Sequence, residues 1–314
     1  MKQVFFIVAL LFNFSICLCQ TMTNEEQAEL GSKLVEAYNN REWEKVLRYC
    51  DTIDCYQLKH IDYSLLKAEA LAGLKRYDEA IDYLKSLNDK TESYYITHEI
   101  GNIYWLKGDI DNAIYYYDLT IMSRPTYARP HINLGMIYQD LGQKEEAISH
   151  YMSAIKLFYA NEFYDEIETY ASNIIVNIDS TYINAYIYIE RALHLKNNFE
   201  GAMRVCMDID AWCDEHKEEG AIFMENIYHM GENTFYLGDY EFALDRFFDY
   251  LTMLNNRPYD DNMECGAWVY LGVIMKRAED YQVAEDCFKK AREINEDRAN
   301  SLLKKINERC QFPD

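Results

Sequence analysis

A small or β-branched residue recurs along almost the whole chain at regular intervals. The first three intervals are 34, 33 and 34 residues, and the later ones are 55, 41 and 41 residues. A unit of this length cannot bury its apolar face alone, so such a chain must stack neighbouring units against one another. We call these positions the anchors: Val46, Ala80, Ala113, Ala147, Ala202, Ala243 and Ala284.

Two further positions keep a fixed distance from the anchors. Gly or Ala stands twelve residues before five of the seven (Ala68, Gly101, Gly135, Gly231 and Gly272), and Leu34 and Glu190 stand there in the others. An apolar or aromatic residue follows each anchor by four: Cys50, Leu84, Tyr117, Tyr151, Cys206, Phe247 and Phe288. Residues at i, i+4 and i+7 share one side of a helix, and a small residue lets two helix axes approach to roughly 8–10 Å. The pattern predicts paired helices that cross at the anchors.

Residues 265–291 carry the pattern most completely. Trp268 and Leu271-Gly272 give W-x2-L-G, and Ala284, Phe288 and Ala291 give A-x3-F-x2-A. This resembles the tetratricopeptide repeat, a two-helix unit of about 34 residues. The resemblance implies an all-α fold, a right-handed α-solenoid of about seven helix hairpins with one irregular half-repeat and a C-terminal capping helix.

The resemblance divides the chain into consecutive units within one domain, residues 20–314. The register breaks after Ala154, so either a helix near 144–159 serves both neighbours or 162–182 is an inserted half-repeat. Two late repeats are longer, and their extra residues are expected after the second helix, at 213–220 and 257–263. We expect repeats near 27–60, 61–93, 94–127, 128–161, irregular 162–182, 183–223, 224–264 and 265–295, with the cap at 296–310.

Residues 1–19 resemble a secretory signal peptide. Lys2 precedes an apolar run over 4–12, and Cys17 and Cys19 are small residues at the cleavage positions, which leaves Gln20 as the new N-terminus. This apolar run is shorter than a transmembrane helix, which needs about 20 apolar residues. Lipidation at one of these cysteines is the alternative, although Ile16 and Leu18 replace the small residue that lipoprotein signals prefer.

The export signal predicts a periplasmic or secreted protein. The mature chain contains no Asn-x-Ser/Thr acceptor, which favours a bacterial envelope over a eukaryotic secretory lumen. The formal net charge is −22, which disfavours nucleic acid and anionic membranes and favours basic partners; a solvated helix surface is the alternative explanation. No later segment could span a bilayer.

The mature chain keeps an odd number of cysteines and no CxxC pair. Cys50 and Cys206 occupy the apolar position of the pattern and are expected in the core. In an exported protein the other cysteines could form disulfides, but the sequence does not reveal which of them would pair. They are Cys55, Cys213, Cys265, Cys287 and Cys310.

No P-loop, GxGxxG, HExxH or nucleophile elbow is present, so the sequence predicts a protein that is not an enzyme and needs no cofactor. Cys213 and His216 could supply two ligands at most, so no metal site is expected. We expect a scaffold or adaptor of the cell envelope that binds a protein or peptide. A structural subunit that self-associates is the alternative.

The resemblance implies that the first helices line a concave groove suited to an extended or helical peptide. Asn102 and Asn133 are similar to two positions of the carboxylate-clamp subgroup, but His98 stands where that subgroup has Lys. For each residue the alternative is ordinary packing. The groove residues expected are Tyr95, His98, Asn102, Trp105, Arg129, Asn133, Met136, Gln139, Arg191, His194, Tyr228 and Phe235, with Ile132 and Glu232 beside them.

Overall fold

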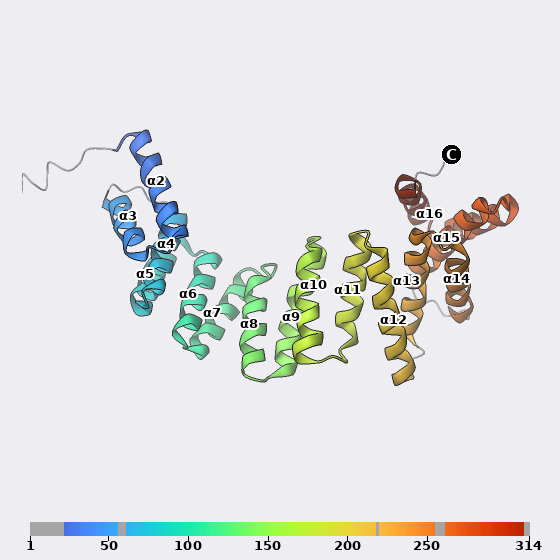
Figure 1. Ribbon diagram of the computed structural model, residues 1–314, viewed down its shortest axis with the longest axis horizontal. Coiled ribbons are helices and arrows are strands. Elements are labelled where there is room, and N and C mark those ends of the chain that lie inside the picture. Colours follow the sequence, from blue (N-terminus) through green and yellow to red (C-terminus); the bar gives the residue numbers. More distant parts are fainter. Residues whose placement is uncertain (1–21, 56–60, 218–219, 255–260, 311–314) are drawn as a thin grey trace, which may run out of the picture. The chain divides into compact units, whose positions relative to one another are not determined.

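The computed structural model describes residues 22–55, 61–217, 220–254 and 261–310, and all regular structure in these ranges is helical (Figure 1). The predicted signal peptide lies outside them. The first helices are α2 (Asn24–Asn39), α3 (Trp43–Cys55), α4 (Ile61–Gly73), α5 (Tyr77–Thr91), α6 (Tyr94–Lys107), α7 (Ile110–Ser123) and α8 (Arg129–Asp140). They are followed by α9 (Lys144–Ala160), α10 (Tyr164–Asn173), the π-helix η1 (Ile174–Ile178), α11 (Ile183–Leu195), α12 (Phe199–His216), α13 (Ala221–Leu237), α14 (Tyr240–Leu254), α15 (Asp261–Arg277) and α16 (Tyr281–Cys310).

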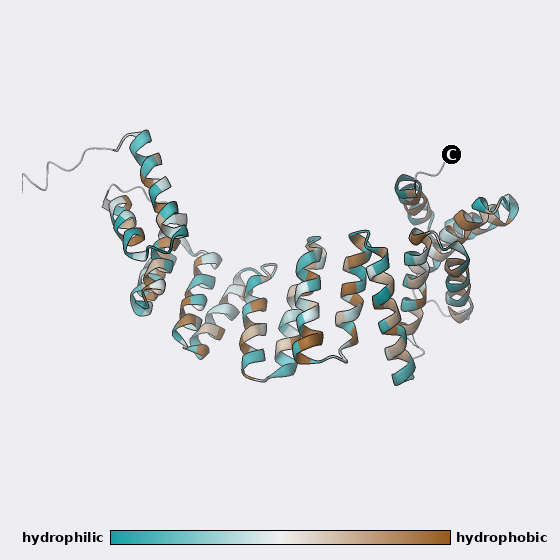
Figure 2. Ribbon diagram, viewed as in Figure 1, coloured by the Kyte–Doolittle hydropathy of each residue, from teal (hydrophilic) through white to brown (hydrophobic). Residues whose placement is uncertain are grey.

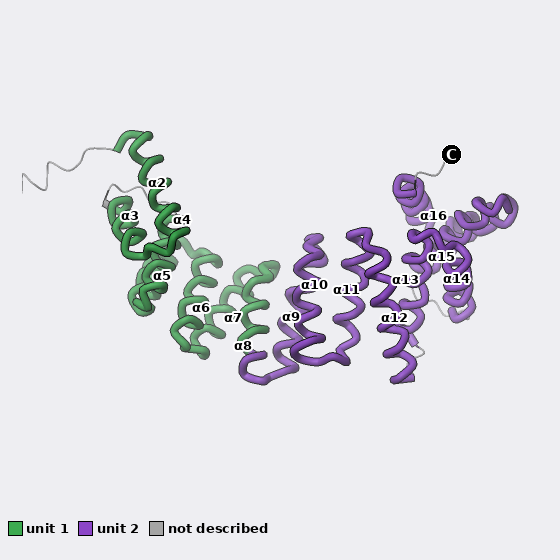
Figure 3. The backbone as a smooth tube through the Cα atoms, viewed as in Figure 1, with its two compact units in different colours: residues 1–137 green, residues 138–314 purple. Residues whose placement is uncertain are grey.

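Contacts divide the chain into two compact units, residues 1–137 and residues 138–314 (Figure 3). The division falls inside α8. In both units apolar and polar residues alternate around the individual helices (Figure 2). This is the pattern of helices that bury one face and solvate the other, as the helices of a solenoid do.

One type of turn joins the helices of each pair. A residue with positive φ ends the first helix, and the next residue donates its backbone N–H to the carbonyl five residues earlier, at 2.8–3.0 Å. Asp109 N, for example, lies 2.9 Å from Tyr104 O, while Gly108 N lies 2.9 Å from Trp105 O. These two bonds form a Schellman motif, which satisfies the last carbonyls of the helix. The positive-φ residues are Arg41, Lys75, Gly108, Gly142, Glu162, Asn197, Gly238 and Glu279.

The anchors lie five residues after these turns and form the core of the pairs. None of the seven is more than 3% exposed. Cys50 and Cys206 are buried as predicted, and Cys265, Cys287 and Cys310 are also free thiols. The anchors therefore lie in a tightly packed core, where even a small change of side-chain volume is expected to lower stability.

The irregular segment is explained by a helix with two neighbours. The turn at Gly142 precedes α9, and the turn at Glu162 joins α9 to α10 with Ile167 buried at the anchor position. Thus α9 follows one turn as a second helix and precedes the next as a first helix. This corresponds to the first of the two arrangements that the register break allowed.

The extra residues of the late repeats lengthen helices. Helix α12 has 18 residues, and α13 and α15 have 17 each, whereas α6 has 14. Cys213, expected beyond the helix, is buried within α12. The placement after the second helix was therefore wrong for 213–216, which lie within α12. Residues 261–263 do follow the second helix α14, and they begin α15. Residues 218–219 and 255–260 lie outside the described ranges.

The C-terminal helix packs onto the helices of unit 2. Helix α16 breaks at Asn295 (φ −157°, ψ 99°), whose Oδ1 accepts the backbone N–H of Arg298 at 2.9 Å and so caps the segment that follows. Ala299, Leu302 and Ile306 of that segment are buried in one hydrophobic cluster with residues of α13 and α15. The segment 296–310 therefore covers apolar side chains that would otherwise face solvent.

Candidate functional site

A row of polar side chains runs along the first helices of the pairs in unit 1. We call it the amide–carboxylate face, and it consists of Tyr38, Glu69, His98, Glu99, Asn102 and Asn133. These side chains come from α2, α4, α6 and α8. All except His98 are only partly buried, so they can meet both the core and solvent.

Asn102 is the centre of this face. Its Nδ2 donates to Glu99 Oε2 at 3.1 Å, and its Oδ1 accepts from Asn133 Nδ2 at 2.9 Å and from the Tyr117 hydroxyl at 2.7 Å. The bond from Asn133 joins α8 to α6. Because the carboxamide of Asn102 has donors and acceptors satisfied at fixed distances, its orientation is fixed.

His98 lies beneath this face and is only 3% exposed. Its Nε2 is 3.2 Å from Asn133 Nδ2, and its ring lies 5.3 Å from that of Tyr127. A buried imidazole that bonds the neighbouring repeat is a packing element. It does not supply the exposed cation that the carboxylate-clamp subgroup has at this position.

The carboxylates of this face raise the pKa values of their neighbours. The hydrogen bond to Glu69, together with burial, raises the pKa of Tyr38 to about 12. Burial raises the pKa of Glu69, and the charge of Glu99 adds to the effect, while the bond from Tyr38 opposes it. The face therefore concentrates negative charge and acceptor oxygens.

Other residues expected in the groove surround the face. Tyr95 is 39% exposed and Met136 is 41% exposed. Arg129 is exposed and Trp105 is half-buried. Ile132 is buried and belongs to the core. The structure thus brings Tyr95, His98, Asn102 and Asn133 together and leaves aromatic, aliphatic and cationic side chains available beside them.

In unit 2 three expected groove residues are core residues. His194, Tyr228 and Phe235 are buried. Tyr228 and Phe235 belong to the hydrophobic cluster that includes Leu302 of the C-terminal segment. Their assignment to an open groove was therefore wrong. The rings of Phe199 and Tyr236 lie against His194. Tyr250 lies against Tyr228, and Tyr270 lies against Phe235.

The remaining two, Gln139 and Arg191, bond to their own chain. Gln139 Oε1 accepts from Tyr151 at 3.0 Å and from Asn173 at 2.9 Å. Arg191 Nη1 donates to Glu232 Oε2 at 3.0 Å. Both polar groups are therefore already hydrogen-bonded within the protein in this conformation.

Arg191 belongs to a buried charged network between α11 and α13. Glu190 Oε1 accepts from Asn233 at 2.8 Å, and its Oε2 lies 3.2 Å from His229 Nδ1 and 3.7 Å from Arg191 Nη1. Burial alone would raise the pKa of Glu190, but His229 and Arg191 outweigh it and lower the pKa to about 2. The network satisfies charges that burial alone would penalise strongly.

Two consecutive repeats of this chain match a family model. Residues 96–127 and 128–161 match the model described as tetratricopeptide repeat. They contain most of α6, all of α7, α8 and α9, and four of the six residues of the amide–carboxylate face: His98, Glu99, Asn102 and Asn133. The chain is a tetratricopeptide-repeat protein. Within the described residues its fold is all-α, as the resemblance implied.

The chain is also similar to several solved structures with distant sequences. A tetratricopeptide repeat protein from Parabacteroides merdae is 14% identical over 88% of this chain and 97% of that chain, with a TM-score of 0.34. NprR in complex with its cognate peptide NprX is 17% identical over 90% and 82%, with a TM-score of 0.37. The TPR2AB-domain:pHSP90 complex of yeast Sti1 is 16% identical over 84% and 100%, with a TM-score of 0.34. No curated protein matched the chain, so the assignment rests on the repeat match.

Four polar side chains of this region were not predicted from sequence: Tyr38, Glu69 and Glu99 of the amide–carboxylate face, and Tyr117, which bonds Asn102. Glu99 lies three residues before Asn102 on α6, a spacing that places both on one side of the helix. Tyr117 was recognised only as a large apolar residue of the pattern, yet its hydroxyl bonds Asn102. A tyrosine at an otherwise apolar core position is the signal that could have indicated a polar partner.

Two other kinds of site are not found in the described parts of the chain. No three His, Cys, Asp or Glu side chains in these ranges are arranged to hold a metal ion. None of the described helices is long and apolar enough to cross a membrane.

Proposed function

We propose that this protein is a non-enzymatic scaffold that binds a peptide segment of another protein at the amide–carboxylate face. The observation that carries the proposal is the bonded set of Asn102, Asn133 and Glu99 on adjacent first helices of two matched repeats. Tetratricopeptide repeats use extended surfaces of stacked helix pairs for binding. Fixed amides and carboxylates provide bonding groups for a peptide backbone and for basic side chains.

The charge of the face favours a basic segment. Glu69 and Glu99 supply two carboxylates, and the whole chain carries a formal net charge of −22. A Lys or Arg side chain of the ligand would form charge-assisted bonds with these oxygens. Tyr95 and Met136, both exposed beside them, would contact its apolar parts.

We place this activity outside the cytoplasm, in a bacterial envelope, because residues 1–19 have the features of a signal peptide. Expression of the full chain in a bacterial host, followed by fractionation and N-terminal mass analysis, tests this placement. A periplasmic product that begins at Gln20 would support it. A product that retains residues 1–19 in the cytoplasm would contradict it, and a lipid-modified Cys17 or Cys19 would replace it with membrane anchoring.

The binding proposal is tested with random peptides displayed on phage and selected on purified residues 20–314. Selected peptides should be rich in Lys and Arg, and their affinity should fall with increasing salt. Removal of one bonding group by Asn133→Ala should weaken binding about 3- to 10-fold, the range of one hydrogen bond. Fluorescence anisotropy of labelled peptides measures the change.

The matched control is Asn177→Ala in unit 2, which removes an exposed amide that bonds only Asn173, at 2.7 Å. It should leave peptide affinity unchanged. Selection of acidic peptides, or an equal loss in the two variants, would contradict the assignment of this face. Light scattering on the free protein tests the self-associating alternative, since a stable oligomer would favour a structural role.

A further inference from the structure

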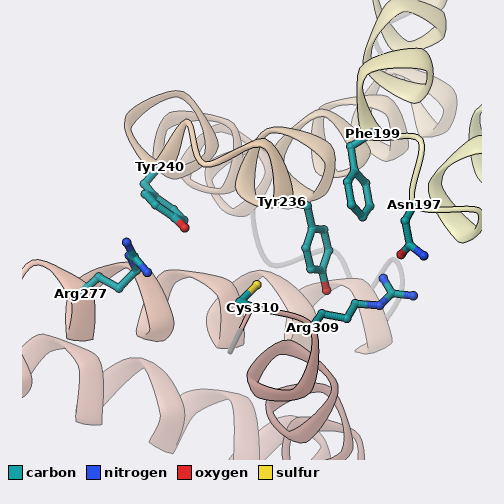
Figure 4. Close-up of a pocket in the computed structure, with 7 residues that line it drawn as sticks. All are labelled: Asn197, Phe199, Tyr236, Tyr240, Arg277, Arg309 and Cys310. Atoms are coloured by element: carbon teal, nitrogen blue, oxygen red, sulfur yellow. The ribbon is translucent and has the colours of Figure 1, made fainter. Parts of the chain in front are cut away.

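Unit 2 contains a cleft of about 480 Å³ that the proposed peptide-binding face does not include (Figure 4). It is formed where turns of three helix pairs meet the end of α16. A cleft of this size is in the range that holds a small ligand or a terminal residue. The lining residues are Asn197, Phe199, Tyr236, Tyr240, Arg277, Arg309 and Cys310.

The cleft is cationic in a strongly acidic protein. The Arg277 guanidinium lies 4.4 Å from the ring centre of Tyr240, and that of Arg309 lies 5.4 Å from the ring centre of Tyr236. Figure 4 shows the two arginines on opposite sides of Cys310. Two guanidinium groups on aromatic rings, in a chain of net charge −22, mark a place suited to an anion.

Arg309 is not paired with a carboxylate in the described ranges. Within the described ranges Arg191, Arg246 and Arg292 each have a carboxylate oxygen within 4.0 Å, whereas Arg309 has none there. The Arg309 side chain is also exposed. Apart from the hydrogen bond to the Tyr236 hydroxyl, its guanidinium N–H groups are therefore available to an anion from solution.

Hydrogen bonds between tyrosine hydroxyls determine which groups of the cleft donate a hydrogen bond and which accept one. The Tyr270 hydroxyl donates to Glu232 Oε1 at 3.2 Å, so in the 3.4 Å contact between the two tyrosine hydroxyls Tyr236 is the donor. The Tyr236 oxygen is thus left to accept from Arg309. Asn197, held at φ 61° in its turn, contributes a carboxamide to the same end of the cleft (Figure 4).

The walls of the cleft are aromatic. The ring of Phe199 stacks on that of Tyr236 with centres 4.7 Å apart and planes at 13°. Tyr240 lies at the other end, beneath Arg277. An apolar group between these rings would gain burial while an attached anion meets the guanidinium.

We propose that this cleft binds an organic carboxylate monoanion attached to an aromatic or aliphatic group. The carboxylate accepts from Arg309 and from Asn197, and the apolar group packs against Phe199 and Tyr236. A guanidinium matches the two oxygens of a carboxylate in one plane. The long-range field of the acidic chain penalises a dianion such as phosphate more than a monoanion. The carboxylate could belong to the C-terminus of a peptide with an apolar last residue or to a free small acid.

The test uses probes that differ in one group and is independent of the amide–carboxylate face. Calorimetric titration compares N-acetylphenylalanine with N-acetylphenylalanine amide, and the carboxylate should bind at least about 10-fold more tightly, the range of a charge-assisted bond. An acetylated tetrapeptide ending in Phe and 3-phenylpropionate distinguish the two sources. Tighter binding of the peptide indicates a chain terminus, and tighter binding of the free acid indicates a small molecule.

Variants locate the site. Arg309→Gln should weaken the carboxylate probe about 10- to 100-fold. Asn197→Gly keeps the left-handed backbone but removes the amide and should weaken it about 3- to 10-fold. Arg292→Gln is the matched control: it removes the same charge from the same helix, at a side chain paired with Glu285, and should leave the affinity unchanged.

A second readout uses the thiol of Cys310, which lines the cleft and is partly exposed. Bound carboxylate should slow its alkylation by iodoacetamide, followed by peptide mass analysis, and the amide probe should not. Equal affinity for acid and amide, phosphate binding as tight as carboxylate binding, or full affinity in a folded Arg309→Gln protein would each overturn the proposal.

Discussion

Gly272 lies directly against the ring of Phe288. A Cβ added at Gly272 would stand 2.5 Å from Phe288 Cε1, closer than side chains pack. The two residues hold the positions twelve before and four after the anchor Ala284, so the absent side chain of one makes room for the ring of the other. The same relation recurs in Gly101 with Tyr117 and in Gly231 with Phe247, both at 2.9 Å.

Replacement of this glycine should therefore be costly. We expect Gly272→Ala to lower the free energy of unfolding by about 1–3 kcal/mol, the cost of overpacking a core, although alanine is the better helix former. Urea denaturation followed by circular dichroism measures it. Adding Phe288→Leu should recover part of the loss, since a smaller side chain relieves the contact. Unchanged stability in the single variant would refute the crossing contact.

The turns provide a test of backbone conformation without packing. Nothing lies within 4 Å of a Cβ added at Gly238, which has φ 86°. Gly238→Ala should therefore cost about 1–2 kcal/mol through the left-handed conformation alone. Glu162 occupies the same place in its own turn with φ 64°, so Glu162→Gly should raise the melting temperature. Shifts of the same sign in the two variants would contradict this account.

The sequence predicted the helix pairs because their contacts repeat. Every helix pair crosses in the same way, so a small anchor and its packing partners recur at the same offsets in each pair. The burial of Tyr228 and Phe235 was not predictable in this way, because it depends on rings of the following helices. Tyr228 lies 5.4 Å from Tyr250, and Phe235 lies 4.9 Å from Tyr270, between ring centres. The amide–carboxylate face was predicted in part. Asn102 and Asn133 were found by register, whereas the position of His98 beneath them required the neighbouring rings.

Two departures from the repeat pattern have a common explanation. Leu34 and Glu190 replace the small residue twelve positions before the anchor. In both pairs the residue four positions after the anchor is a cysteine, Cys50 or Cys206. Leu34 and Cys50 lie in one core cluster. In this pair the large residue stands twelve before the anchor and the small one four after it, the reverse of Gly272 and Phe288. The large side chain and the small one have thus exchanged places in this pair.

This exchange can be reversed. Cys50→Phe alone should destabilise the first pair by about 1–3 kcal/mol because Leu34 already fills the space, and Leu34→Gly alone should cost more through the cavity it leaves. The double variant restores the arrangement of Gly272 and Phe288 and should be more stable than the sum of the single effects. Urea unfolding of the four proteins gives the coupling energy. Additive effects would show that the two side chains do not share the crossing.

Arg191 neutralises a buried carboxylate, so its loss should be severe. Arg191→Met leaves Glu232 without its 3.0 Å ion pair and should cost about 3–5 kcal/mol. Adding Glu232→Gln should recover much of this loss, because a neutral amide can still accept from Tyr270 and needs no countercharge. The comparison is made by chemical denaturation at pH 7. A Met variant as stable as the natural protein would show that the network is not held by charge.

His194 should make the protein less stable in mild acid. Burial lowers the pKa of His194 below its ordinary value of about 6.5, and its Nδ1 lies 2.8 Å from Asn233 Oδ1. Below pH 6.5 the unfolded chain binds a proton that the folded protein resists, so this stabilisation is present above pH 6.5 and is lost as the pH falls through the lowered folded value. The free energy of unfolding should therefore decrease from pH 7.5 to pH 5. His194→Gln, which retains a donor toward Asn233, should decrease less over the same interval. An equal or larger decrease in that variant would assign the acid sensitivity to other groups.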